Sequence, residues 1–160
     1  LFSDIRYNLP VINEMRQKVA AGWKVFNYLT VHFNRNAFPK EIPIKKALHG
    51  YEYPYIFNIT SIPIAKKFKF DDDDREFTKI LIDTIVTFVK NGNPSTDDID
   101  WQPASGENNL RYLELKPFSP EMKAPLFGDR LQFWALLTKH YEFDIIRGIH
   151  KKTLHSKDEL

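Results

Sequence analysis

The segment at residues 23–33, WKVFNYLTVHF, constrains the fold more than any other part of the chain. Aromatic and β-branched residues dominate it, which is typical of a β-strand. Apolar side chains occupy alternate positions on both faces, with Val25, Leu29, Val31 and Phe33 on one and Phe26 and Tyr28 on the other. Such a strand is buried between two layers, as in a sheet with helices on each side. Because one strand cannot form a sheet, we expect its neighbours to come from elsewhere in the protein.

Two helices are expected around this strand. The first covers residues 10–21, since Pro10 fits the first helical position and Gly22 can end the helix. Its expected apolar face contains Val11, Met15 and Val19. The second follows four aspartates at 71–74, which we interpret as capping residues of a helix N-terminus rather than as an acidic binding site. Its apolar positions at helical spacing are Phe77, Ile80, Leu81, Thr84, Ile85 and Phe88, and the sequence NGNP then ends it.

The rest of the sequence predicts a polar loop at 95–109, a short strand at 111–115 and a last helix. One face of that helix is expected to carry Phe127, Leu131, Trp134, Thr138 and Tyr141. We divide the chain into a main part, residues 1–143, and a basic tail, residues 144–160.

Charge and composition exclude several classes of function. The 23 basic residues are interspersed with 21 acidic ones, so a nucleic acid is not an expected partner. No apolar run is long enough to span a membrane. The absence of cysteine excludes disulfides and thiolate metal sites, and His150 and His155 lack the spacing and partners of a zinc site. We therefore expect no metal.

The last four residues, Lys157, Asp158, Glu159 and Leu160, form a retrieval signal for the endoplasmic reticulum, which a retrieval receptor recognises at a C-terminus. The sequence starts at Leu1 without a secretory leader, so we expect this chain to be the C-terminal portion of a longer lumenal protein. Asn58, Ile59 and Thr60 form a glycosylation sequon, although the adjoining segment has a packed character.

The sequence ALHGYEYPYIF, residues 47–57, contains the candidate for chemistry. His49 is followed by Gly50, and Glu52 lies three residues after the histidine. By itself the pattern fits a surface loop with a solvated histidine and a surface acid better than a catalytic site. The order of the other segments along the chain decides between a surface loop and a catalytic site.

Taken in order, the segments resemble the C-terminal third of a type-B carboxylesterase, the family that includes the cholinesterases. The resemblance is carried by SDIRYNLP (3–10), FNYLTVHFN (26–34), LHGYEYPYIF (48–57), FVKNGNPS (88–95) with Trp101 and YLEL (112–115), and FW (133–134). It covers the chain to about Tyr141. It implies the C-terminal part of an α/β hydrolase fold, an incomplete sheet flanked by helices.

The resemblance implies that His49 is the histidine of a Ser–acid–His triad. Gly50 would allow a sharp turn, and Glu52 would form hydrogen bonds beneath the site without taking part directly. In this fold the triad follows the chain order serine, acid, histidine. The sequence contains no G-x-S-x-G motif, so the serine and the acid are expected in other parts of the protein, and this chain alone is expected to be inactive.

Two functions remain open from the sequence. The first is a serine carboxylesterase of the endoplasmic reticulum lumen, of the gut or liver type, that hydrolyses small-molecule carboxylic esters without a cofactor. The alternative is a non-catalytic, cholinesterase-like interaction protein or a truncated pseudo-enzyme. The resemblance also implies that Leu9 and Leu131 replace a pair of bridged cysteines found in cholinesterase-like relatives, so these two leucines are expected to touch.

Overall fold

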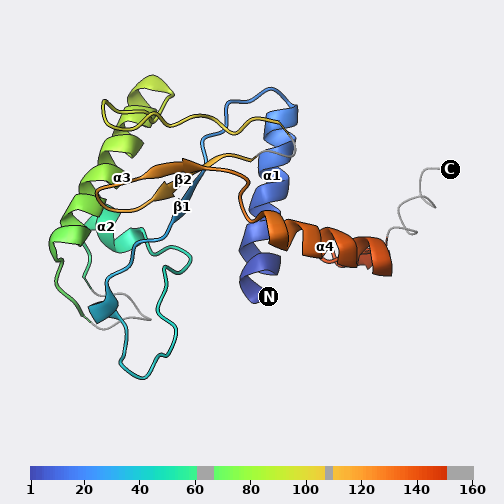
Figure 1. The fold of residues 1–160 in the computed structure, drawn as a ribbon, viewed down its shortest axis with the longest axis horizontal. Coiled ribbons are helices and arrows are strands. Elements are labelled where there is room, and N and C mark those ends of the chain that lie inside the picture. Colours follow the sequence, from blue (N-terminus) through green and yellow to red (C-terminus); the bar gives the residue numbers. More distant parts are fainter. Residues whose placement is uncertain (61–66, 107–109, 151–160) are drawn as a thin grey trace. The chain divides into compact units, whose positions relative to one another are not determined.

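The computed structural model describes residues 1–60, 67–106 and 110–150 (Figure 1). The chain divides into two compact units. The first contains residues 1–25 with the described residues of 105–110 and of 125–160. The second contains residues 26–104 and 111–124, apart from the undescribed 61–66.

The N-terminal helix lies in the first unit. A π-helical turn, η1 (Asp4–Asn8), continues directly into α1 (Leu9–Ala20), so the expected helix is confirmed. The expected apolar face was wrong at Val11, which is 52% exposed. The buried stripe is Leu9, Ile12 and Met15. These three residues follow one another at a spacing of three and so share one face of the helix, which excludes Val11.

The last helix, α4 (Gly128–Tyr141), belongs to the same unit. The Asp4 carboxylate accepts hydrogen bonds from Arg130 Nη1 at 3.1 Å and Trp134 Nε1 at 3.3 Å, which joins α4 to η1. Trp134 is buried, whereas Tyr141 at the end of the predicted apolar face is 64% exposed.

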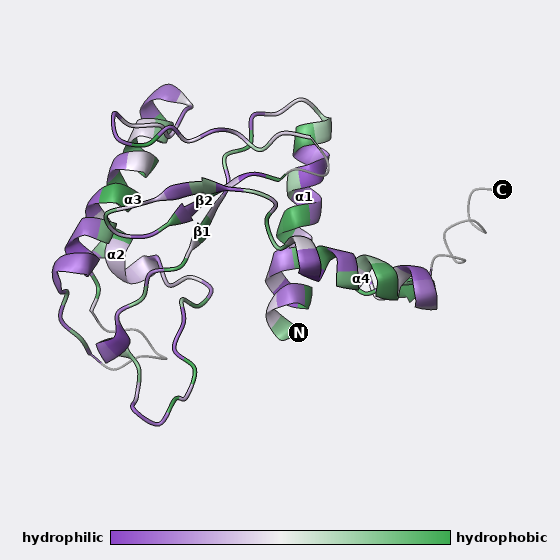
Figure 2. Cartoon of the chain, viewed as in Figure 1, coloured by the Kyte–Doolittle hydropathy of each residue, from purple (hydrophilic) through white to green (hydrophobic). Residues whose placement is uncertain are grey.

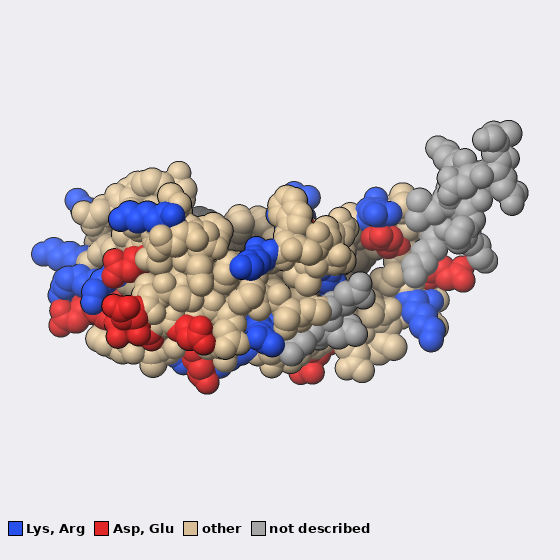
Figure 3. All heavy atoms as spheres, turned by 90° about the horizontal axis from the view of Figure 1, so that it is seen from above, with Lys and Arg blue, Asp and Glu red and all other residues tan. Residues whose placement is uncertain are grey.

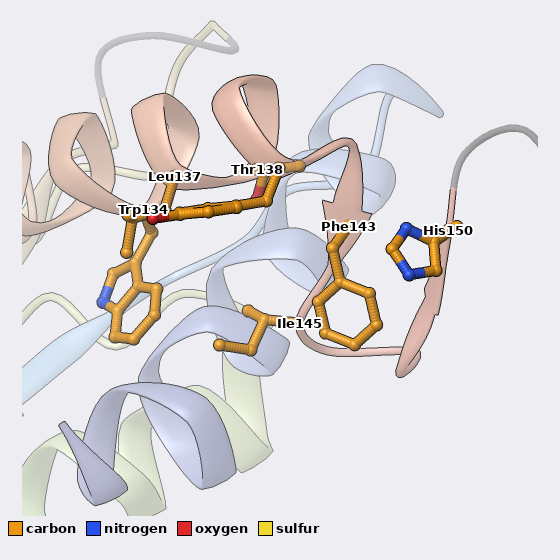
Figure 4. Close-up of a pocket in the computed structure, with 7 residues that line it drawn as sticks. Trp134, Leu137, Thr138, Phe143, Ile145 and His150 are labelled. Atoms are coloured by element: carbon orange, nitrogen blue, oxygen red, sulfur yellow. The ribbon is translucent and has the colours of Figure 1, made fainter.

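A short hairpin follows α4, formed by β4 (Phe143–Asp144) and β5 (Ile149–His150). Apart from Phe143, this hairpin lies in the segment that we assigned to a basic tail. An apolar pocket lies between helix and hairpin, and Figure 4 shows Trp134, Phe143, Ile145 and His150 around it.

The second unit contains a three-stranded sheet in the order β1 (Tyr28–Thr30), β2 (Tyr112–Leu115) and β3 (Glu121–Lys123). β1 runs parallel to β2, and β3 runs antiparallel to it. The predicted strand at 23–33 is thus confirmed only at Tyr28–Thr30. Among the described residues β1 pairs with β2 alone, so its second edge has no strand beside it.

Helix α3 (Asp72–Asn91) forms where the sequence predicts it. Asp71 caps its N-terminus in a reciprocal capping box with Asp74, and Gly92 ends it at φ +68°. Apolar and polar residues alternate along α3 in Figure 2. Phe77 and Leu81 are fully buried, while Phe88 on the predicted apolar face is 46% exposed.

The core of the second unit is rich in aromatic side chains. It combines residues of α3, β2, the short 3₁₀ helix η2 (Arg35–Ala37), α2 (Tyr53–Phe57) and the loop with Trp101. Its fully buried members include Tyr51, Tyr55, Phe77, Leu81, Leu113 and Leu115. On the face shown in Figure 3, basic and acidic side chains are interspersed. Among the described helices, none combines the length and the apolar character that a membrane-spanning segment requires.

Candidate active site

The candidate catalytic histidine lies on a tight turn that leads into α2. The N–H of Tyr51 donates to the carbonyl oxygen of Leu48 at 3.0 Å, and the N–H of Tyr53 donates to that of Gly50 at 3.1 Å. Gly50 has φ +73°, the left-handed region that side chains with a Cβ rarely adopt. The side chain of His49 is exposed. A glycine thus allows the turn that presents the histidine, and α2 begins within four residues of it.

Glu52 ties this turn to the sheet. The Thr30 hydroxyl donates a hydrogen bond to Glu52 Oε1 at 2.9 Å. Thr30 is the last residue of β1 and pairs with Leu115, the last residue of the parallel strand β2. The histidine turn is therefore fastened at the carboxyl end of two parallel strands, where open α/β sheets place their functional loops.

Tyr55 of α2 provides a second point of attachment. Its hydroxyl donates to Asp74 Oδ1 at 3.0 Å, and its side chain is 1% exposed. Its ring packs edge-on against Phe77, with ring centroids 4.8 Å apart, and near Phe70, at 5.3 Å. Burial and the neighbouring Asp74 charge raise the pKa of Tyr55, so its hydroxyl stays protonated and remains a donor.

The Asp74 carboxylate is the centre of a buried polar network. It is completely buried and also receives hydrogen bonds from His32 Nε2 at 2.8 Å, from the Asp71 N–H at 3.0 Å and from the side-chain amide of Asn34. Burial acts to raise the pKa of Asp74, but these bonds outweigh it and hold the pKa below its usual value. Asp74 is therefore ionised, and because a carboxylate only accepts, His32 donates from Nε2.

The network was only partly predicted. The partner of His32 lies 42 residues away along the chain, so local sequence does not predict this bond. Asp74 was interpreted as a capping residue alone. A signal for its burial does exist in the sequence, because Asp74, Phe77, Leu81 and Thr84 follow one another at the spacing of a single helix face, and all four are buried.

The remaining predicted sites have different outcomes. Asn58 is exposed and lies at φ +52° at the end of α2. Lys157, Asp158, Glu159 and Leu160 lie outside the described residues. No cluster of three or more metal-binding side chains occurs in the part of the chain that the structure describes.

Comparisons with known proteins give the family. The model of the carboxylesterase family matches residues 1–134. Gut esterase 1 of Caenorhabditis briggsae is 32% identical over 100% of this chain, and the chain spans 29% of that relative's length. The para-nitrobenzyl esterase of Bacillus subtilis is 33% identical over 48% of the chain.

Solved structures give the fold. The structure of juvenile hormone esterase from Manduca sexta matches with a TM-score of 0.62 at 22% identity, over 81% of this chain and 26% of that one. A PNB esterase structure matches with a TM-score of 0.55 at 23% identity. The incomplete sheet with its helices is thus part of an α/β hydrolase fold. This chain belongs to the carboxylesterase family.

Proposed function

We propose that this chain is the C-terminal segment of a serine carboxylesterase and contributes the triad histidine, His49. The observation that carries the proposal is the hydrogen bond from Thr30 to Glu52, because it fastens the histidine turn at the carboxyl end of parallel strands. Ester hydrolysis by the family agrees with it. The triad serine and acid would come from sequence outside these 160 residues.

The proposed chemistry requires a group that titrates near neutral pH. A serine hydroxyl is a weak nucleophile, and an imidazole can accept its proton as it attacks the ester carbonyl. The same imidazole then protonates the leaving alcohol and later activates the water that releases the acyl group. A buried carboxylate must hold the other ring nitrogen, which fixes the tautomer and orientation of the imidazole.

The proposed substrates are small carboxylic esters. This is the chemistry implied by the names of the relatives, which are esterases from nematodes and bacteria. No contact among the described residues specifically supports the alternative, a non-catalytic interaction protein.

The proposal is tested on the complete protein that contains this chain, with a short-chain nitrophenyl ester as substrate. We expect His49→Ala to lower kcat by at least about a thousandfold, as the loss of a triad member does in serine hydrolases. His140→Ala is the matched control, since His140 is an exposed histidine on α4. Equal turnover by the two variants would contradict the assignment of His49.

Two further proposals concern the secretory pathway. We propose that the protein is retained in the endoplasmic reticulum through residues 157–160 and that Asn58 can carry a glycan. The exposure of the Asn58 side chain supports the second proposal. Treatment of the secretory-pathway protein with an N-glycosidase should increase its mobility on a gel, and Asn58→Gln should remove that part of the shift.

A further inference from the structure

The polar network around Asp74 suggests a role beyond the stability of α3. Four donors converge on this one carboxylate, two on each oxygen: His32 and Tyr55 on Oδ1, Asn34 and the Asp71 N–H on Oδ2. The carboxylate is 0% exposed. A buried carboxylate with every acceptor position used fixes the geometry of its donors, because breaking any one bond leaves part of a charge unsatisfied.

These donors come from segments that are distant in the sequence. His32 and Asn34 follow β1, Tyr55 belongs to α2, and Asp74 lies in the first turn of α3. Asp74 therefore holds together the end of β1, the start of α3 and the helix that directly follows the histidine turn. Within α2, Tyr55 is the residue whose side chain is hydrogen-bonded to Asp74, and this bond attaches α2 to the network.

The link from Tyr55 to His49 is short and continuous. The N–H groups of Tyr55 and Ile56 both donate to the carbonyl oxygen of Glu52 at 3.0 Å. The next hydrogen-bonded turns lead back through Gly50 to Leu48, so residues 48–57 form a chain of consecutive turns. A shift of Tyr55 would therefore be passed to the turn that carries His49.

We propose that Asp74 is a positioning residue for His49, acting through the Tyr55 hydroxyl to fix α2 and the histidine turn. The inference rests on the proposed function of His49. It assigns Asp74 no contact with substrate. The bond from Thr30 to Glu52 fastens the histidine turn to the sheet, and the bond from Tyr55 to Asp74 fastens it to α3. The Tyr51 hydroxyl adds a longer bond, of 3.5 Å, to the Asn34 carbonyl oxygen.

The test uses Tyr55→Phe in the complete protein, because this change keeps the packed ring and removes only the donor to Asp74. Tyr112→Phe is the matched control. Tyr112 is a half-buried tyrosine of β2, in the same unit but outside residues 48–57 and not among the four donors to Asp74. Measurements are kcat, KM, the pH dependence of kcat/KM and thermal unfolding.

We expect Tyr55→Phe to lower kcat about tenfold with KM within about twofold, since a small misplacement of a general base slows the chemical step more than binding. It should also displace the acidic limb of the profile of kcat/KM against pH, which reports the essential base. Tyr112→Phe should keep kcat within about twofold of the parent, even where its Tm falls by a similar amount.

A double-mutant comparison tests the route through Asp74. Adding Tyr55→Phe to Asp74→Ala should cost little further kcat, because the alanine removes the acceptor and the phenylalanine removes the donor of the same bond. Where Asp74→Ala does not fold, the comparison of the two tyrosine variants decides alone. Equal kcat for Tyr55→Phe and Tyr112→Phe, with an unshifted pH profile, would overturn the inference; the proposed function would then still be tested by His49→Ala. A parent protein without esterase activity would contradict both.

Discussion

The Thr30 hydroxyl donates a hydrogen bond of 2.9 Å to the Glu52 carboxylate, and so joins the last residue of β1 to the turn that carries His49. Because Thr30 and Glu52 are 22 positions apart, local sequence alone does not predict their contact. The relationship gives Glu52 a structural task that is independent of any direct part in the chemistry.

The first prediction concerns this bond. Thr30→Val removes the donor and keeps the shape, so it should destabilise the complete protein by about 1 kcal/mol and lower kcat more than it changes KM. Thr87→Val on α3 is the control, and it should leave kcat unchanged. Steady-state kinetics and denaturant unfolding check both variants; an unaltered kcat in Thr30→Val would speak against an anchoring role for Glu52.

The second prediction concerns acid stability. The pKa of Asp74 is lowered in the folded state, because its four hydrogen bonds favour the ionised form despite burial. Stability from this group is therefore fully present above the unfolded-state value of 3.8 and is lost as pH falls below it. Asp74→Asn should lack this dependence and should be less stable near neutral pH by about 3 kcal/mol. Unfolding free energies between pH 2 and pH 7 measure the difference, which should appear below pH 3.8; parallel curves for variant and parent over that acid range would contradict it.

The third prediction concerns Leu9 and Leu131, whose contact stays a prediction. The hydrogen bonds from Arg130 and Trp134 to Asp4 bring α4 against the turn just before Leu9, which supports it. The double variant Leu9→Cys with Leu131→Cys should form a disulfide on oxidation, which requires Cα atoms about 4.4–6.8 Å apart. Two free thiols after oxidation in the folded protein would show that the alignment of α4 is wrong.

The fourth prediction concerns the chain alone. β1 has one paired edge among the described residues, and an unpaired edge with apolar faces promotes aggregation. Isolated residues 1–160 should therefore aggregate or unfold without a cooperative transition, and should hydrolyse a nitrophenyl ester no faster than their His49→Ala variant. A monomer with a sharp thermal transition, or turnover that depends on His49, would be the contrary result.

The fifth prediction concerns localisation. Deletion of residues 157–160 from the complete protein should release it from secreting cells into the medium, since the receptor-read address is then missing. The comparison is with the intact protein expressed in the same cells. An equal intracellular share for both proteins would argue against retention by this signal.

The sequence predicted best those elements whose signals are local. The capping aspartates, the spacing of Phe77 and Leu81, and Gly92 define α3 with no help from the rest of the molecule. The boundaries of β1 were not predictable in this way, because strand residues become a strand only where a partner pairs with them. The short strand β3 was missed for the same reason, since Glu121 and Lys123 show no apolar alternation and Lys123 instead pairs with Glu114 of β2 at 2.8 Å.

The candidate site likewise combines features that local sequence predicts with contacts that it does not predict. The order of His49, Gly50 and Glu52 could be recognised in the sequence, and glycine is the residue type that allows the positive φ observed at Gly50. The contacts of Glu52 with Thr30 and of Tyr55 with Asp74 could not, because both join segments that only tertiary folding brings together. The burial of Asp74 was not predicted, because a capping role already accounted for all four aspartates at 71–74.

The most direct measurement of the central claim is the structure of the complete protein. We predict that the Nε2 atom of His49 lies within about 3.2 Å of the hydroxyl oxygen of a serine in a G-x-S-x-G turn, with a buried carboxylate at Nδ1. A structure in which that serine contacts a different histidine, or in which the ring of His49 points away from it, would contradict the account.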